Sequence, residues 1–146
     1  MPVDVPAPDD HPAIRRQRSP RGLRLDQLAG EPWIVIVAGH AARRQFDRAA
    51  AEAGFSPRVQ FETENYNVAQ SLVGTGIGVT LLSRLTVVPT PGAVHRELTR
   101  PRLYRQLYAV TATTVLTPLA ERFVALLEQV SAEVAEGWAA TPVGTI

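Results

Sequence analysis

The sequence of 146 residues contains no cysteine and no lysine, and only 6% of its residues are aromatic. The lack of cysteine excludes disulfide bonds, thiolate metal sites and a cysteine nucleophile. The lack of lysine excludes the phosphate-binding loop that ends in lysine followed by serine or threonine. No apolar run approaches the length that spans a bilayer, so we expect no membrane partner.

An excess of charge of one sign is also missing, because 15 basic and 14 acidic side chains leave a net charge of +1. Such a balance creates no field that would favour bulk binding to nucleic acid or to a membrane surface. The N-terminus carries Asp4, Asp9 and Asp10 among prolines and lacks the apolar core of a signal peptide. We therefore expect a cytoplasmic protein.

Groups that would support metal binding or catalysis are scarce. The three histidines, His11, His40 and His95, lack the spacing of metal ligands, so we predict no metal site and no cofactor. A triad built on His40 and Ser83 would need a Gly-x-Ser-x-Gly elbow, which the sequence does not contain. We expect no catalytic residues and no enzymatic activity.

The stretch 61–83 predicts a strand, a helix and a second strand in close succession. Val59 and Phe61 alternate with polar residues, as in a half-buried strand. Asn65 can then cap a helix. One face of this helix carries, at helical spacing, Val68, Leu72 and Val73. The strand that follows is made of Val79, Leu81 and Leu82.

The glycines between this helix and this strand are interpreted as a helix stop. A dinucleotide-binding loop places its glycines after a strand and before a helix, and the predicted order here is the reverse. Gly76 can adopt the left-handed conformation that ends a helix. Gly74 lies inside the helix, where we expect alanine to be tolerated.

The rest of the chain predicts another βαβ unit before this one and a long helix after it. The expected elements are a helical turn at 23–28, strands at 33–38, 57–63, 93–98 and 103–112, a helix at 41–53, and a helix at 117–137. Strands that alternate with helices predict an α/β fold with right-handed crossovers.

Several motifs, in this order, resemble the effector-binding domain of LysR-type transcriptional regulators. They are Asp10-His11-Pro12, Leu-Ala-Gly-Glu-Pro-Trp-Ile at 28–34, Ala-Gly-Phe-Ser-Pro at 53–57, the segment 72–82 with its Gly-Ile-Gly-Val, and Thr-Pro-Leu-Ala at 117–120 with Phe123 and Leu126. The resemblance covers nearly the whole chain. Ser83 stands where the family usually has proline.

The resemblance implies a fold like that of the type 2 periplasmic binding proteins, in which two α/β lobes enclose an effector cleft. It assigns residues 23–112 to the second lobe, with a mixed sheet and flanking helices, and residues 113–137 to a helix that returns to the first lobe. Residues 1–22 would be a connector and residues 138–146 a tail. Most of the first lobe and the DNA-binding helix-turn-helix have no counterpart here, so we expect a truncated domain that contacts DNA only through a helix-turn-helix absent from this chain.

The ligand-binding prediction concerns two places where a predicted strand gives way to a helix, because open α/β sheets bind ligands there. The predicted ligand-binding residues are Gly39, His40 and Ala41 at the first place and Glu64, Asn65 and Tyr66 at the second. Free N–H groups at both helix N-termini would favour an anion, such as a carboxylate effector. As alternatives, His40 is an exposed loop residue, and Asn65 only caps its helix while Tyr66 packs locally.

The leading functional hypothesis is a ligand-sensing module of a transcriptional regulator with a small-molecule effector. An alternative is an oligomerisation or interaction fragment, since the last helix carries an apolar stripe that would need a cover. We expect a homo-oligomer. The stripe consists of Leu119, Phe123, Leu126, Leu127, Val130 and Val134. A small-solute-binding protein is a third hypothesis, which the missing signal peptide disfavours.

Overall fold

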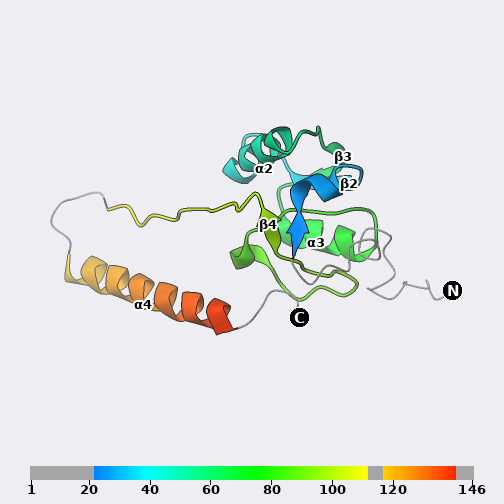
Figure 1. The fold of residues 1–146 in the computed structure, drawn as a ribbon. Helices are drawn as coiled ribbons and strands as arrows, with labels where there is room; N and C mark the ends of the chain where they lie inside the picture. Colours follow the sequence, from blue (N-terminus) through cyan, green and yellow to red (C-terminus); the bar gives the residue numbers. More distant parts are fainter. Residues whose placement is uncertain (1–21, 112–116, 141–146) are drawn as a thin grey trace. The chain divides into compact units, whose positions relative to one another are not determined.

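The computed structural model describes residues 22–111 and 117–140, which divide into two units. The first unit ends at Leu103 and the second begins at Tyr104. Within the described residues, the first unit holds the strands and helices α2 and α3, and the second holds the long helix α4 (Figure 1). Nearly all of the predicted connector lies outside these residues, as does the end of the predicted tail.

A parallel pair of strands joined by a helix forms the centre of the first unit. Strand β2 (Pro32–Ile36) is followed by helix α2 (Ala41–Glu52) and by strand β3 (Arg58–Thr63), which pairs with β2 in parallel. This arrangement confirms the predicted βαβ unit. Residues 33–36 are all buried, as their continuous apolar run predicts for a strand with both faces covered.

Helix α3 (Tyr66–Gly74) leads from β3 back toward β2 and completes a second parallel crossover. Val79 follows this helix, and its carbonyl accepts the Ile34 N–H of β2 at 2.9 Å. Of the strand predicted over 79–82, the structure has only one parallel bridge, between Val79 and Trp33.

A second small sheet pairs β1 (Leu23–Arg24) with β4 (Leu98–Arg100), again in parallel. The strands predicted over 93–98 and 103–112 are wrong, because residues 93–97 and 103–111 form no strand. Strand propensity reflects packing against neighbouring strands, and the strand-favouring side chains of 103–111 have no such neighbour in the described part of the chain. All strand pairing in residues 22–111 and 117–140 is parallel, whereas we expected a mixed sheet.

The core of the first unit gathers around a tryptophan. Its buried side chains are Leu25, Trp33, Val35, Phe46 and Ala49. The Trp33 ring lies 4.6 Å from the Phe46 ring, centroid to centroid. Leu25 enters this core from a 3-10 turn, η2 (Leu25–Leu28). The predicted helical turn is thus confirmed over 25–28 but not at Leu23, which belongs to β1. Phe46 and Ala49 confirm the predicted inner face of α2.

The buried face of α3 differs from the predicted one. Ala69 and Gln70 are its fully buried residues, whereas Val68, which was expected inside, is 46% exposed. The apolar pattern was misleading here because a polar side chain, Gln70, occupies the inner face. Its hydrogen-bond partners lie on other segments of the chain.

Two glycines mark the end of α3 for different reasons. Gly76 has a φ of +79° and donates its N–H to the Val73 carbonyl at 2.9 Å, which confirms the predicted helix stop. Gly74 is the last residue of the helix, and a Cβ there would overlap the carbonyl oxygen of Pro91. The expectation that alanine is tolerated at Gly74 is therefore wrong.

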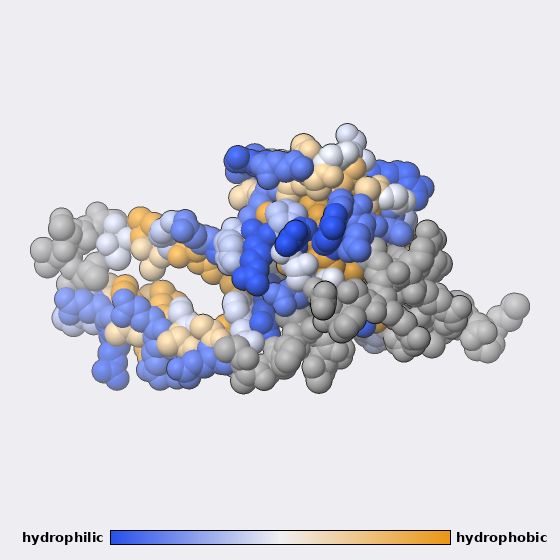
Figure 2. Space-filling view, viewed as in Figure 1, coloured by the Kyte–Doolittle hydropathy of each residue, from blue (hydrophilic) through white to orange (hydrophobic). Residues whose placement is uncertain are grey.

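Helix α4 (Pro118–Ala140) begins as predicted, with Thr117 Oγ1 accepting the Ala120 N–H at 3.3 Å. It continues past Gly137, the predicted stop, because one glycine inside a helix costs only about 1 kcal/mol relative to alanine. Large hydrophobic side chains of α4 lie at the surface (Figure 2), namely Leu119, Phe123, Leu126, Leu127 and Val130. None of the helices in the described ranges is long and apolar enough to cross a membrane.

Candidate functional site

The two predicted ligand-binding segments leave the same edge of the central sheet. The carboxyl ends of β2 and β3 are adjacent, since Ile36 pairs with Thr63. The Val37 N–H donates to the Thr63 carbonyl at 3.2 Å. The loops that follow these strands lead directly into the N-termini of α2 and α3, as we expected from the sequence.

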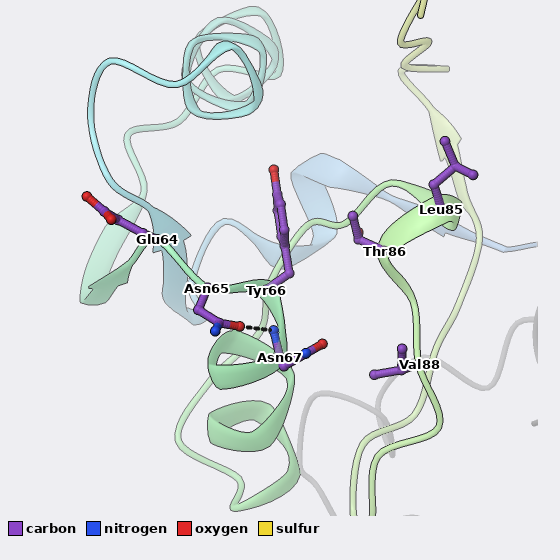
Figure 3. A pocket seen from close by; sticks show the side chains of 7 residues that line it. All are labelled: Glu64, Asn65, Tyr66, Asn67, Leu85, Thr86 and Val88. Atoms are coloured by element: carbon purple, nitrogen blue, oxygen red, sulfur yellow. Dashed lines mark hydrogen bonds between the residues drawn. The ribbon is translucent and has the colours of Figure 1, made fainter. Parts of the chain in front are cut away.

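A pocket of about 550 Å³ opens at the start of α3 (Figure 3). One wall comes from the β3–α3 junction, and the other from the 3-10 turn η3 (Arg84–Thr86) and the residues after it. The lining residues are Glu64, Asn65, Tyr66, Asn67, Leu85, Thr86 and Val88. In Figure 3, the Tyr66 ring rises from the start of α3, and Glu64 points away from the η3 wall.

The pocket includes only half of the predicted ligand-binding residues. Glu64, Asn65 and Tyr66 line it, whereas Gly39, His40 and Ala41 do not, and these three are exposed. Sequence reasoning missed the η3 wall, because its contact with α3 joins residues far apart in the chain. The sequence held one sign of the contact between α3 and η3, which is the polar residue Gln70 among the apolar residues of α3.

Asn65 caps α3, which confirms the predicted N-cap. Its Oδ1 accepts the N–H of Asn67 at 2.8 Å and of Val68 at 3.4 Å (Figure 3 draws the shorter of these bonds). Its own N–H donates to Thr63 Oγ1 at 3.1 Å. Two of the N–H groups on which an anion site would depend are therefore already occupied.

The polar side chains that remain available in the pocket are neutral or acidic. Within residues 22–111 and 117–140, the side chains of Glu64, Tyr66 and Asn67 make no hydrogen bond or ion pair. Thr86 uses its hydroxyl proton on the Ser83 carbonyl, at 2.8 Å. No basic side chain is among the lining residues. The pocket therefore offers hydrogen bonds, an aromatic ring and aliphatic surface, with Glu64 as its only charged group.

Beneath the pocket, the Gln70 amide joins both walls. Gln70 is 1% exposed, and its Nε2 donates to the carbonyls of Tyr66 at 3.1 Å and Thr86 at 3.0 Å. Its Oε1 accepts the Val88 N–H at 3.0 Å and lies 3.3 Å from His95 Nε2. Because Oε1 is an acceptor, His95 Nε2 carries the proton in this contact. Burial lowers the pKa of His95 below its ordinary value.

The start of α2 is held by two arginines. His40 is the N-cap residue, with an extended backbone and no capping bond from its side chain, and it is exposed, as one alternative proposed. The Arg44 guanidinium donates to the Gly39 carbonyl at 2.6 Å. Arg43 bonds the Ile36 carbonyl at 3.1 Å and pairs with Glu62 at 2.6 Å and Asp47 at 2.9 Å. The hydrogen bond to Glu62 is the main cause that raises the pKa of Arg43.

Groups of three or more side chains that could hold a metal ion do not occur in the described ranges. The arrangement at the pocket can bind a small organic molecule through hydrogen bonds and apolar contacts.

Comparison with known proteins agrees with the motifs noted in the sequence. Residues 2–132 match the family of the LysR substrate binding domain. Two relatives are the uncharacterized HTH-type transcriptional regulators YybE and YcgK of Bacillus subtilis. YybE is 28% identical over 117 residues (80% of this chain, 39% of YybE). YcgK is 32% identical over 106 residues (72% of this chain, 30% of YcgK).

The DNA-binding transcriptional dual regulator OxyR of Escherichia coli is also similar, at 29% identity over 127 residues, which is 85% of this chain and 40% of OxyR. The chain thus spans 30% to 40% of the length of these relatives. Since the family match covers most of its residues, the chain belongs to the LysR substrate binding domain family.

Proposed function

We propose that this chain is the effector-sensing part of a LysR-type transcriptional regulator, and that a small molecule binds in the pocket between α3 and η3. The observation that carries this proposal is the pocket itself, at the carboxyl edge of parallel strands, with unpaired polar groups from Glu64, Tyr66 and Asn67. The function is sensory and not catalytic, and the regulator acts in the cytoplasm.

The fold proposed for this function is that of a type 2 periplasmic-binding-protein-like lobe over residues 23–112. The two successive parallel crossovers to β2 support it. Residues 113–137 would then pack on a further lobe of the regulator. DNA binding would require a helix-turn-helix outside this chain, because a strand separates α2 from α3 and the family match occupies residues 2–132.

An uncharged or amine-bearing effector suits the pocket better than a carboxylate. Asn65 already occupies two N–H groups at the start of α3, and the only charged lining group is the Glu64 carboxylate. A carboxylate ligand would meet repulsion from Glu64 with no basic lining residue to offset it. Tyr66, Leu85 and Val88 would take an aromatic or aliphatic portion.

A nuclear magnetic resonance titration of the 146-residue chain tests this proposal with three molecules of similar size: benzamide, benzylamine and benzoate. We expect benzamide and benzylamine to shift the amide signals of residues 64–67 and 85–88, and benzoate to shift them less. Tyr66→Ala and Asn67→Ala should weaken these shifts. Gln60→Ala, an exposed change on β3 outside the pocket lining, is the matched control. Shifts that fall elsewhere with all three molecules would rule the pocket out.

Gly39, His40 and Ala41 remain proposed ligand contacts, because they leave the same sheet edge as the pocket wall. A ligand larger than benzamide would be needed to reach them. His40→Ala should therefore leave benzamide binding unchanged and weaken the binding of a larger effector. The measurement is the same titration with a compound recovered from a screen of longer amides.

Self-association is a second candidate function, and the exposed stripe of α4 favours it. Leu119 is 81% exposed and Phe123 60%, and hydrophobic side chains in such a row are covered in most stable proteins. We propose that two copies of the chain pair through this stripe as a homo-oligomer. Sedimentation of the chain at high micromolar concentration tests this pairing.

A further inference from the structure

We infer that Gln70 is the positioning residue of the pocket: its buried amide sets the spacing between the α3 wall and the Thr86–Val88 wall. This inference rests on the proposed function only for the identity of the ligand site. The wall contacts themselves are hydrogen bonds of the chain, and they can be tested without a ligand.

The Gln70 side chain binds backbone groups of both walls at once. Its Nε2 donates to the Tyr66 carbonyl at 3.1 Å, in the first turn of α3. The same nitrogen donates to the Thr86 carbonyl at 3.0 Å, and Oε1 accepts the Val88 N–H at 3.0 Å. Tyr66, Thr86 and Val88 are all lining residues. One side chain therefore orients three of the seven residues that form the pocket.

No other hydrogen bond in the described part of the chain links α3 to the Thr86–Val88 segment. The bonds of η3 are internal, from Thr86 N–H to the Ser83 carbonyl at 2.9 Å and from Val87 N–H to the Arg84 carbonyl at 3.4 Å. The segment after η3 is not a strand and has no ladder to hold it. Its attachment to α3 by hydrogen bonds thus depends on Gln70.

An apolar side chain of similar size could fill the same volume but could not replace these bonds. The Thr86 carbonyl and the Val88 N–H would lose their partner, and a partly buried polar group without a partner is destabilising. The wall would move until water satisfied both groups. His95 strengthens the same cluster from a third segment, because its Nε2 shares the Oε1 acceptor at 3.3 Å. The hydrogen bonds that set the spacing of the walls thus all pass through the Gln70 amide, with His95 as a further contact of that amide.

Backbone amide hydrogen exchange of the full chain, measured by nuclear magnetic resonance, tests the inference. In Gln70→Leu we expect the Val88 N–H to exchange about tenfold faster, since one hydrogen bond of this kind is lost. The Ile34 N–H, bonded to the Val79 carbonyl at 2.9 Å in the central sheet, should keep its wild-type protection. Ser71→Ala is the matched control on the same helix, since the Ser71 hydroxyl donates to the Asn67 carbonyl of that helix at 2.9 Å.

Gln70→Glu supplies a second variant with a pH readout. The protonated carboxyl can still donate one bond to a wall carbonyl, whereas the ionised carboxylate would repel the carbonyls of Tyr66 and Thr86. Burial raises the pKa of a carboxyl in this place, whereas a protonated His95 beside it would lower that pKa. Benzamide binding by Gln70→Glu should therefore fall as the carboxyl ionises, while binding by the wild type should not follow that profile.

Unchanged Val88 exchange in Gln70→Leu would overturn the inference, and so would an equal acceleration at Ile34, which reports a general loss of stability. If Gln70→Leu does not fold, the chemical shifts of the Val88 and Thr86 amide signals in Gln70→Glu are followed against pH. Chemical shifts that do not change as the carboxyl ionises overturn the inference. Failure of benzamide to bind the wild type would count against the proposed ligand site. The exchange result at Val88 would still decide whether Gln70 sets the wall spacing.

Discussion

At the scale of single residues, Gly74 and Gly92 meet backbone to backbone where α3 ends. A Cβ on Gly92 would overlap the Gly74 carbonyl oxygen, and a Cβ on Gly74 would overlap the carbonyl oxygen of Pro91. Both obstacles are backbone atoms, which cannot turn aside as a side chain can. This contact joins the end of α3 to the turn that precedes the His95 segment.

We expect Gly74→Ala to lower the free energy of unfolding by about 1–3 kcal/mol, as overpacking does. Gly76→Ala should cost about 1 kcal/mol, because a residue with a Cβ is strained at the left-handed φ of +79°. Gly30→Ala is the control, since within the described residues no atom beyond its chain neighbours lies within 4 Å of its Cβ position. Urea denaturation of the three variants measures their free energies of unfolding and checks the expected order of the losses. A loss at Gly74 no larger than at Gly30 would contradict the contact.

His95 should make stability depend on pH. Burial lowers its folded pKa below the ordinary 6.5, so the unfolded chain binds a proton more readily than the folded chain. The contribution of His95 is therefore fully present above pH 6.5 and is lost as the pH falls from that value through the folded pKa.

His95→Gln keeps a hydrogen-bond donor and removes this titration. We expect the denaturation midpoint of the wild type to fall more steeply than that of His95→Gln as the pH drops from about 8 to about 5. Parallel profiles for the two proteins would show that His95 contributes nothing to the pH dependence.

At the scale of elements, Arg43 ties three elements together at the sheet edge. Its side chain, only 15% exposed, joins the start of α2 to the end of β2 through the Ile36 carbonyl and to β3 through Glu62. Arg48 and Glu52 form a comparison pair within α2 at 3.0 Å, with the Arg48 side chain 83% exposed. Water and salt screen the exposed pair more strongly.

Double-mutant cycles should therefore separate the two pairs. We expect a coupling free energy of about 0.5–1 kcal/mol for Arg43→Met with Glu62→Gln. The cycle of Arg48→Met with Glu52→Gln should give about 0.3 kcal/mol or less. Urea denaturation at low and high salt measures both. Equal coupling free energies would mean that the Arg43–Glu62 pair, which links α2 to β3, stabilises the fold no more than the exposed Arg48–Glu52 pair does.

At the scale of the whole molecule, the exposed stripe of α4 predicts self-association. Burying a large apolar side chain contributes about 1.5–3 kcal/mol, so burial of this row of side chains against another protein surface is favourable. We expect the chain to sediment as a dimer at high micromolar concentration. Phe123→Glu with Leu127→Glu should dissociate it while the circular dichroism of the first unit persists.

Ala125→Glu with Ala132→Glu is the matched control, because the helical spacing places these residues on the opposite face of α4. It adds the same charge and should leave the dimer intact. A wild type that stays monomeric, or a control that dissociates equally, would remove the support for pairing through the stripe.

Much of the first unit followed from local signals. The apolar run of β2, the inner face of α2 and the cap at Asn65 depend on interactions within a few residues of each other, which a sequence displays directly. The helix stop at Gly76 is equally local. The α/β class, the first βαβ unit and three of the seven lining residues of the pocket were accordingly predictable.

Reading along the chain was enough to find β2, α2, β3, α3 and the start of α4, together with the family, because these depend on residue spacing and on local motifs. Three features emerged only from packing: 79–82 and 103–111 are not strands, a Cβ at Gly74 meets backbone atoms, and Gln70 faces inward. Gln70 meets partners 16 to 25 residues away. Contacts of that range exist only after helices and loops have packed, so no local pattern could reveal them.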